Sequence, residues 1–252
     1  VDLTALDPRG KEIRRIRGGE IAMVFQEPMT TLAPVYTIGS QIMEAILLHQ
    51  DVTKTEAKEQ TVDILDRVGM PKPAQVVDMY PHELSGGMRQ RGMIAMALSC
   101  HPNLLVADEP TTALDVTTEA QILDLMRSLQ DELGMAIMYI THDLGVVAEM
   151  AEDVVVMYMG KVVEHAAVHD LFYHPAHPYT QALLRSIPRI GKKMDRLQVI
   201  EGMVPDPYRI PVGCPFHPRC RESISGVCDE IEPPWIEVEP GHWARCVLYQ
   251  KG

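Results

Sequence analysis

The sequence predicts an α/β fold with a parallel sheet, a helical segment and a separate, irregular C-terminal part. After residue 102, short apolar runs alternate with amphipathic stretches of helical periodicity, which is typical of parallel strands joined by helices. Between about residues 28 and 102 the spacing of apolar residues is mostly helical. Beyond about residue 166, proline, histidine and cysteine become frequent and regular periodicity ends.

The bulk composition narrows the possible functions. A hydrophobic content of 46% and a charged content of 23% are those of an ordinary globular protein with material for a core. The net charge of −12 argues against a nonspecific nucleic-acid binder, because phosphate contacts need clustered Lys and Arg. No apolar run approaches the roughly 20 residues of a spanning helix, and no signal peptide is visible, so we expect any membrane role to depend on a partner.

The first half of the chain contains one expected strand and several expected helices. The apolar run 21–25 predicts a buried strand, followed directly by Gln26. Segments 41–50 and 54–68 place apolar residues three and four positions apart, which predicts two amphipathic helices. A further helix is expected at 85–99, with the serine at its start marking the N-terminus.

The second half contains the alternating pattern. The expected elements are strands at 104–107, 135–140, 153–158 and 161–164 and a helix at 117–133. That helix has an apolar face made of Ile122, Leu125, Leu129 and Leu133. Gly134 predicts its end, and Gly160 predicts a turn that pairs the last two strands.

Two short segments carry most of the chemistry. Asp108 and Glu109 end the apolar run 104–107, so a buried strand delivers two carboxylates to a sheet edge. There one carboxylate can hold Mg²⁺ and the other can orient a water for attack on a phosphate; a solvated strand end is the alternative. Ser85, Gly86 and Gly87 open the expected helix at 85–99 and offer bare backbone N–H groups. This predicts an anion site, with a plain serine cap and glycine turn as the alternative.

Together, segments 84–91 and 104–110 resemble the signature and Walker B motifs of ABC-type ATPases. The resemblance implies that Asp108 coordinates Mg²⁺ and that Glu109 polarises the attacking water. Asp115 lies in a following segment that resembles the D-loop of this family, which implies that it couples two nucleotide sites.

Further positions fit the same family in order and spacing. Gln26, directly after a strand, resembles the Q-loop residue, which implies a metal ligand at a hinge that reports to a transmembrane partner. His142, after another strand, resembles the H-loop switch that contacts the γ-phosphate. In this family the serine and glycines of the signature contact ATP bound to the opposite subunit. Ser85, Gly86 and Gly87 therefore imply a head-to-tail dimer with ATP between the partners.

A phosphate-binding loop of the form G-x-x-x-x-G-K-[ST] is absent from this sequence. Gly-Lys pairs occur at 10–11, 160–161 and 191–192, but none is followed by Ser or Thr or preceded by the required glycine. The aromatic residue that stacks on adenine in this family is also missing. We therefore expect an N-terminally truncated or incomplete sequence that binds ATP poorly in its own site, with a naturally degenerate subunit as the alternative.

Four of the five cysteines lie in the C-terminal part: Cys214, Cys220, Cys228 and Cys246. Without an export signal, a metal site is favoured over disulfides. Such a set is compatible with zinc or an iron–sulfur cluster, and the missing C-x-x-C pairs favour the cluster; unligated thiols are the alternative. Cys100 stands apart and is expected to be buried.

Two stretches specify the branch of the family. Segment 213–220 resembles the C-terminal extension of dipeptide and oligopeptide importer ATPases, some of which hold a [4Fe–4S] cluster there. Segment 25–32 resembles the same peptide and nickel branch. The resemblance implies that His174 and His177 are structural rather than ligands.

Two residues depart from the branch. Ala33 stands where Asn is usual, and Gly92 stands where an aliphatic residue is usual in the signature helix. A glycine inside a helix costs about 1 kcal/mol relative to alanine. Neither change removes a proposed phosphate contact.

The resemblance implies a three-part organisation. It places a RecA-like ABC ATPase core at 1–27 and 103–165, a helical subdomain at 28–102 and a small Cys-rich extension at 166–252. The implied cofactors are ATP, Mg²⁺ and a [4Fe–4S] cluster.

The implied function is that of the ATP-hydrolysing motor of a dipeptide or oligopeptide importer at the cytoplasmic face of the membrane. Its partners would be an identical or different sister ATPase subunit, two transmembrane permease subunits and, indirectly, an extracytoplasmic substrate-binding protein, with no nucleic acid. Three alternatives remain open. They are an importer of nickel or another small solute, a non-transport ABC protein acting on nucleic acid or ribosomes, and a non-catalytic fragment.

Overall fold

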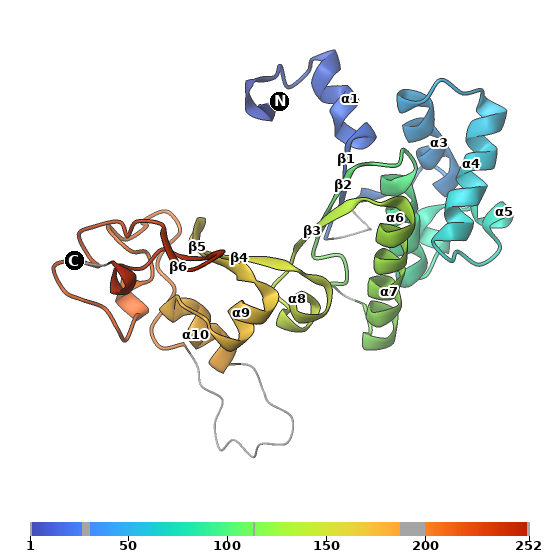
Figure 1. The fold of residues 1–252 in the computed structure, drawn as a ribbon. Coiled ribbons are helices and arrows are strands. Elements are labelled where there is room, and N and C mark those ends of the chain that lie inside the picture. Colours follow the sequence, from blue (N-terminus) through green and yellow to red (C-terminus); the bar gives the residue numbers. More distant parts are fainter. Residues whose placement is uncertain (1, 27–30, 113, 187–199, 251–252) are drawn as a thin grey trace. The chain divides into compact units, whose positions relative to one another are not determined.

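The computed structural model describes residues 2–26, 31–112, 114–186 and 200–250 (Figure 1). The chain divides into two compact units, Val1–Leu144 and Gly145–Gly252, and each is described by itself below. Helix α8, Leu144–Met150, begins at the last residue of the first unit. Among the described residues, no helix combines the length and the apolar character that crossing a membrane requires.

The first unit contains a three-stranded parallel sheet in the order β1–β2–β3. Its strands are β1 Ile21–Val24, β2 Leu104–Asp108 and β3 Ala136–Ile140. Val24 lies beside Ala107, and Asp108 lies beside Ile140, so the three carboxyl ends reach the same edge of the sheet. The strands predicted for this part of the chain are confirmed to within one residue at each end.

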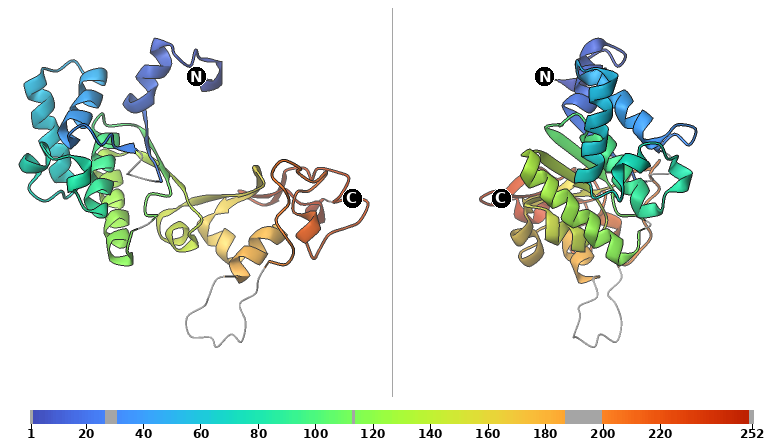
Figure 2. Two further views of the ribbon diagram at one scale, coloured as in Figure 1. Left: turned by 180° about the vertical axis from the view of Figure 1, so that it is seen from behind. Right: turned by 90° about the vertical axis from the view of Figure 1, so that its right-hand side faces the viewer.

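Six helices of the first unit are described. They are α1 Lys11–Gly19, α3 Ile38–His49, α4 Lys54–Arg67, α5 Pro73–Val76, α6 Gly86–Leu98 and α7 Val116–Leu133. Local sequence explains their ends: Thr53 and Glu56 form a capping box at the start of α4, and Gly134 ends α7 with a φ of 64°. Helices α3, α4 and α6 pack against one another as a group (Figures 1 and 2).

The core of the first unit joins this helical group to the sheet. Its fully buried side chains include Ile38, Ile42, Ile46, Met93, Ile94, Leu98 and Leu105. Helix α7 adds Ile122 and Leu129, as the sequence predicts. Its other buried side chains are Leu123 and Met126 rather than the predicted Leu125 and Leu133, which are only partly buried.

The second unit contains a four-stranded antiparallel sheet in the order β4–β5–β7–β6. Its strands are β4 Asp153–Tyr158, β5 Lys161–Ala167, β6 Ile236–Glu239 and β7 His242–Ala244, and its helices include α9 Val168–Tyr173 and α10 Pro178–Arg185. The hairpin predicted around Gly160, whose φ is 75°, is confirmed. The expectation that 153–158 belongs to the parallel pattern is wrong, because its hairpin pairs with strands from the C-terminal end of the chain.

Aromatic rings form the small core of the second unit. Tyr158, Tyr179 and Phe216 pack mutually, with ring centroids 4.7 to 5.4 Å apart. Val163 and Cys214 lie in the same buried cluster. The extension is therefore folded around side chains of the hairpin rather than being a loose tail.

A buried carboxylate connects three parts of the second unit. Oε1 of Glu164, which is inaccessible to solvent, accepts the backbone N–H of Ala176 at 2.6 Å and pairs with Nε2 of His242 at 2.8 Å. Its Oε2 accepts the backbone N–H of His177 at 2.9 Å. Glu164 of β5 thus holds the start of α10 and the strand β7 in place, because a buried charge must be paired and hydrogen-bonded.

Candidate functional site

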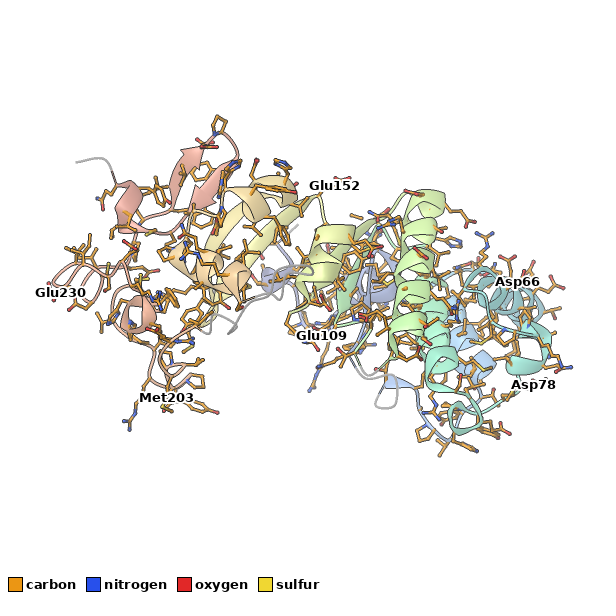
Figure 3. All side chains as sticks on the ribbon, turned by 90° about the horizontal axis from the view of Figure 1, so that it is seen from below. Asp66, Asp78, Glu109, Glu152, Met203 and Glu230 are labelled. Carbon is orange, nitrogen blue, oxygen red and sulfur yellow. The ribbon has the colours of Figure 1, made fainter. Side chains whose placement is uncertain are left out.

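Three of the predicted site residues meet at the carboxyl edge of the parallel sheet. Gln26 comes two residues after β1, Glu109 comes directly after β2, and His142 comes two residues after β3. Their convergence follows from the parallel register, which brings the three strand ends to one edge. Figure 3 labels Glu109, which lies well apart from Asp66 in α4.

The carboxylate of Glu109 is the centre of this group. Its Oε2 accepts hydrogen bonds from Nε2 of Gln26 at 2.6 Å and from Oγ1 of Thr112 at 2.9 Å. Its Oε1 lies 2.8 Å from Nδ1 of His142. The Glu109 side chain is 22% exposed and that of His142 is 79% exposed, so solvent reaches both side chains.

The backbone of Glu109 is in an unusual conformation. Its φ is 43°, in the left-handed region that non-glycine residues avoid. Its N–H donates to the carbonyl of Ile140 at 2.8 Å, one step beyond the β2–β3 ladder. Such strain costs about 1–3 kcal/mol and gathers at functional sites, where surrounding contacts hold it.

The same contacts determine the charge of the site. Hydrogen bonds from His142 first, and from Thr112 next, lower the pKa of Glu109 below its ordinary value. Glu109 is therefore an anion at neutral pH, and it can accept a proton from a bound water.

Asp108 is the second predicted acid of this edge. It is the last residue of β2 and is half-buried. Among the described residues, no hydrogen bond or ion pair holds its carboxylate. Gln26 binds Glu109 through its amide nitrogen, which leaves its side-chain oxygen for another partner. Carboxylate and amide oxygens are ligands that Mg²⁺ accepts, so both residues suit a magnesium site.

The signature residues lie at the start of α6. Ser85 caps this helix, and its Oγ accepts the N–H of Met88 at 3.3 Å. A Cβ on Gly86 would meet nothing within 4 Å, whereas a Cβ on Gly87 would lie 2.9 Å from Cγ2 of Thr118 in α7. Packing within the chain thus requires glycine at 87 but gives no reason for glycine at 86.

Asp115 caps α7 rather than joining the group around Glu109. It accepts the N–H of Thr118 at 3.0 Å and the hydroxyl of Thr118 at 2.7 Å, and these bonds lower the pKa of Asp115. The loop before it is anchored by Gln90 of α6, which is buried and whose amide donates to the carbonyl of Pro110. The predicted role of Asp115 between two nucleotide sites stays a prediction.

Sequence reasoning missed Thr112, Gln90 and Thr118. A signal was available for Thr112, because a hydroxyl three residues after a carboxylate lies within reach of it across a turn. Thr118 carries the same kind of local signal, since it follows Asp115 by three residues at the start of α7. Gln90 reaches a partner 20 residues away and leaves no local signal.

The four C-terminal cysteines belong to the second unit. Cys214, Cys228 and Cys246 are buried, Cys220 is half-buried, and all four line one small cavity. Burial raises the pKa of Cys220 to about 11 and also raises the pKa of Cys214 and Cys246.

The shared cavity by itself does not establish the predicted iron–sulfur ligand set. Within the described ranges, no group of three or more His, Cys, Asp or Glu side chains could hold a metal ion. Cys100 is half-buried rather than buried, and its Sγ lies 3.5 Å from the carbonyl of Ala45.

Comparisons with known proteins agree with the motifs. The family model described as "ABC transporter" matches residues 2–112. The model described as "Oligopeptide/dipeptide transporter, C-terminal region" matches residues 163–228.

The sequence is 52% identical to the oligopeptide transport ATP-binding protein AppD of Bacillus subtilis, over 94% of this chain and 72% of that protein. It is 50% identical to the dipeptide transport ATP-binding protein DppD of Escherichia coli, again over 94% of this chain and 72% of the relative.

Solved structures share the fold. One is the ATP-binding cassette MJ0796 in a dimeric post-hydrolysis state bound to ADP and Pi, with a TM-score of 0.57 and 28% identity; the match covers 65% of this chain and 68% of that one. Another is cbiO1 from Clostridium perfringens, part of the ABC transporter complex cbiONQ, with a TM-score of 0.58 and 28% identity. That match covers 67% of this chain and 64% of the other.

Proposed function

This chain belongs to the ATP-binding proteins of the peptide ABC transporter family, and we propose that it is the ATP-hydrolysing subunit of a dipeptide or oligopeptide importer. The observation that carries the proposal is the group formed by Gln26, Glu109 and His142 at one sheet edge. An ionised carboxylate held by neighbouring donors suits a base that activates water.

Glu109 is the proposed general base. Water attacks the γ-phosphorus, the bond from this phosphorus to the bridging oxygen of ADP breaks, and one water proton passes to Glu109. ADP and phosphate are the products. His142 orients the carboxylate by donating from Nδ1. In its imidazolium form the exposed ring can also donate from Nε2 to the γ-phosphate.

Asp108 and Gln26 are the proposed holders of Mg²⁺. Bound there, the ion would neutralise negative charge on the phosphates. The support is that the Asp108 carboxylate and the Gln26 side-chain oxygen lie at the same sheet edge as Glu109.

The signature residues are proposed to serve the ATP of a sister subunit, in a homodimer or a heterodimer. Ser85 and Gly86 are exposed at the start of α6, where backbone N–H groups and the helix dipole favour an anion. The support at Gly86 is that a Cβ there would meet nothing within 4 Å, which leaves room for a partner's nucleotide to approach the backbone. Asp115 is proposed to couple the two sites.

The helical segment 28–102 is proposed to contact one of two transmembrane permeases. Among its described residues, Val35 and Leu48 are more than 70% exposed. Met43 and Leu47 line a groove formed by α3, the first part of α4 and the residues that follow α5. An exposed apolar surface of this kind is typical of an interaction site. The proposed location is therefore the cytoplasmic face of the membrane. The other proposed parts of the chain are a RecA-like core at 1–27 and 103–165 and an extension at 166–252.

We also propose that Cys214, Cys220, Cys228 and Cys246 bind a [4Fe–4S] cluster. The support is that all four cysteines line one cavity and that three of them are buried. Iron and acid-labile sulfide in equal amounts in anaerobically purified protein would support the cluster. Zinc in their place would support a zinc site. Protein that contains neither iron nor zinc would support free thiols.

The test of the main proposal combines this chain with its sister subunit, two permeases in lipid vesicles and the substrate-binding protein. Peptide-stimulated ATP hydrolysis that Glu109→Gln abolishes is the expected result. Stimulation by nickel alone would favour the small-solute importer. Co-purification with RNA or ribosomes instead of permeases, or hydrolysis unaffected by Glu109→Gln, would contradict the proposal.

A further inference from the structure

Thr112 is one of three residues that donate to the Glu109 carboxylate. An ionised carboxylate offers about four acceptor positions, two on each oxygen. Gln26 and Thr112 occupy both positions on Oε2, and His142 occupies one on Oε1. One position remains, and it lies on Oε1.

We propose that Thr112 is a positioning residue that, with Gln26, saturates Oε2 of Glu109 and leaves Oε1 as the atom that receives the proton of the attacking water. This inference rests on the proposed function. Thr112 itself touches neither water nor nucleotide in this role. It acts by fixing the rotation of the Glu109 carboxylate. The backbone of Glu109 is already held in a strained conformation.

The loop that carries Thr112 is anchored at both ends. The carbonyl of Pro110 accepts a bond from the buried amide of Gln90, and Asp115 caps α7. The N–H of Thr112 donates to the carbonyl of Glu109 at 3.2 Å, which places its hydroxyl over the side chain of the same residue. Thr112 therefore connects the orientation of the base to helices α6 and α7.

Thr111 provides a matched control. It is the adjacent threonine, it is half-buried like Thr112, and its hydroxyl donates to Oε1 of Glu119 at 2.7 Å instead of to Glu109. A purely structural role of threonine in this turn would make the two positions equally sensitive.

The first test measures ATP hydrolysis by the full chain with its sister subunit and permeases. Thr112→Val is expected to lower kcat about fivefold with KM for ATP unchanged, because the carboxylate of Glu109 loses one of the hydrogen bonds that fix its orientation. Thr112→Ser should restore the rate, and Thr111→Val should leave it close to that of the unaltered protein. Equal losses in Thr111→Val and Thr112→Val would overturn the proposal.

The second test needs no turnover, so it remains decisive if the proposed function fails. A double-mutant cycle in urea unfolding compares Thr112→Val, Glu109→Ala and the variant with both changes. The losses of stability should be non-additive for Thr112→Val with Glu109→Ala, because both changes remove the same hydrogen bond, and additive for Thr111→Val with Glu109→Ala. Additive losses for the pair at 112 and 109 would overturn the proposal, and Thr112→Ala serves the same comparison if the valine variant does not fold.

Discussion

The side-chain amide of Gln26 donates to Oε2 of Glu109 across 2.6 Å, although the two residues are 83 positions apart in the chain. The contact exists because Val24 and Ala107 are neighbours in the parallel sheet and both strands end at the same edge. Gln26 also stands at the entrance to the helical segment that follows β1. The proposed base, Glu109, is thus hydrogen-bonded directly to Gln26. A movement of the helical segment would reach Glu109 through this residue.

The first prediction concerns Glu109 itself. Glu109→Gln should lower single-turnover ATP hydrolysis by about 10²- to 10⁴-fold, because the amide cannot accept the water proton. Binding of ATP should equal that of the unaltered protein, since the amide keeps a similar shape. Rapid-quench measurement of ADP formation, beside equilibrium nucleotide binding, separates the two effects. A variant that binds ATP more weakly than the unaltered protein would show that Glu109 supports the fold of the site rather than the chemistry.

The second prediction compares the two signature glycines. Gly87→Ala should lower the free energy of unfolding by about 1–3 kcal/mol, because the new Cβ would lie 2.9 Å from Cγ2 of Thr118. Thr118 cannot rotate away without losing its hydroxyl bond to Asp115. In Gly86→Ala the new Cβ would meet nothing within 4 Å, so the free energy of unfolding should stay unchanged or rise slightly. The rate of ATP hydrolysis should nevertheless fall if Gly86 serves the ATP of a partner.

A double variant checks the cause. Thr118→Ser removes Cγ2 and keeps the hydroxyl, so Gly87→Ala with Thr118→Ser should recover the stability that Gly87→Ala loses. Urea unfolding followed by circular dichroism measures all three variants. If the double variant stays as unstable as Gly87→Ala, the contact with Thr118 is not the reason for glycine at this position.

The convergence at the sheet edge was predictable, because strand ends are local features and parallel strands share an edge. Gln26, Glu109 and His142 each follow an apolar run that the sequence shows plainly. For Thr112 the sequence offered only its position three residues after Glu109, and the contact itself depends on the geometry of the turn. The contact of Gln90 was not predictable, since it depends on the approach of α6 to the loop after Glu109.

The pairing of the strands was harder to predict from the sequence than their positions. The hairpin around Gly160 was predictable from two short apolar runs and one turn. Its pairing with β7 was not, because Glu164 lies beside Ala244, 80 residues later, and such contacts leave no periodic pattern. On α7, four leucine and isoleucine positions suggested the buried face, yet Met126 is buried where Leu125 is only partly so, because the packing partners set the rotation of the helix.

The third prediction uses the unusual glycine of α6. Gly92→Ala should raise the free energy of unfolding by about 1 kcal/mol, because alanine restricts the unfolded chain and favours the helix. Space is available: the new Cβ would lie 3.8 Å from Ile38 and 3.9 Å from Met70, which are ordinary contacts. Gly69→Ala is the control and should destabilise, since Gly69 has a φ of 68° and its Cβ would lie 2.9 Å from Arg91. A loss of stability in Gly92→Ala would mean that this helix position tolerates no added atom.

The fourth prediction concerns acid stability of the second unit. Burial lowers the pKa of His177 from 6.5 to about 4, and its Nδ1 accepts the N–H of Tyr179 at 3.0 Å as the cap of α10. Protonation at Nδ1 would remove that acceptor. Between pH 6.5 and 4 the unfolded state binds the proton that the folded state refuses, so the free energy of unfolding falls as pH falls, by on the order of 3 kcal/mol at pH 4.

His177→Asn isolates this effect. Asparagine can accept the same N–H as a helix cap but does not titrate, so the variant should lose less stability between pH 6.5 and 4 than the unaltered protein. The nearby pair of Glu164 and His242 is the same in the two proteins, so a difference between their pH profiles belongs to position 177. Trp235 and Trp243, the two tryptophans of the chain, lie in this unit, and their fluorescence during urea unfolding reports its stability. Parallel pH profiles for the two proteins would show that His177 is not the acid-sensitive group.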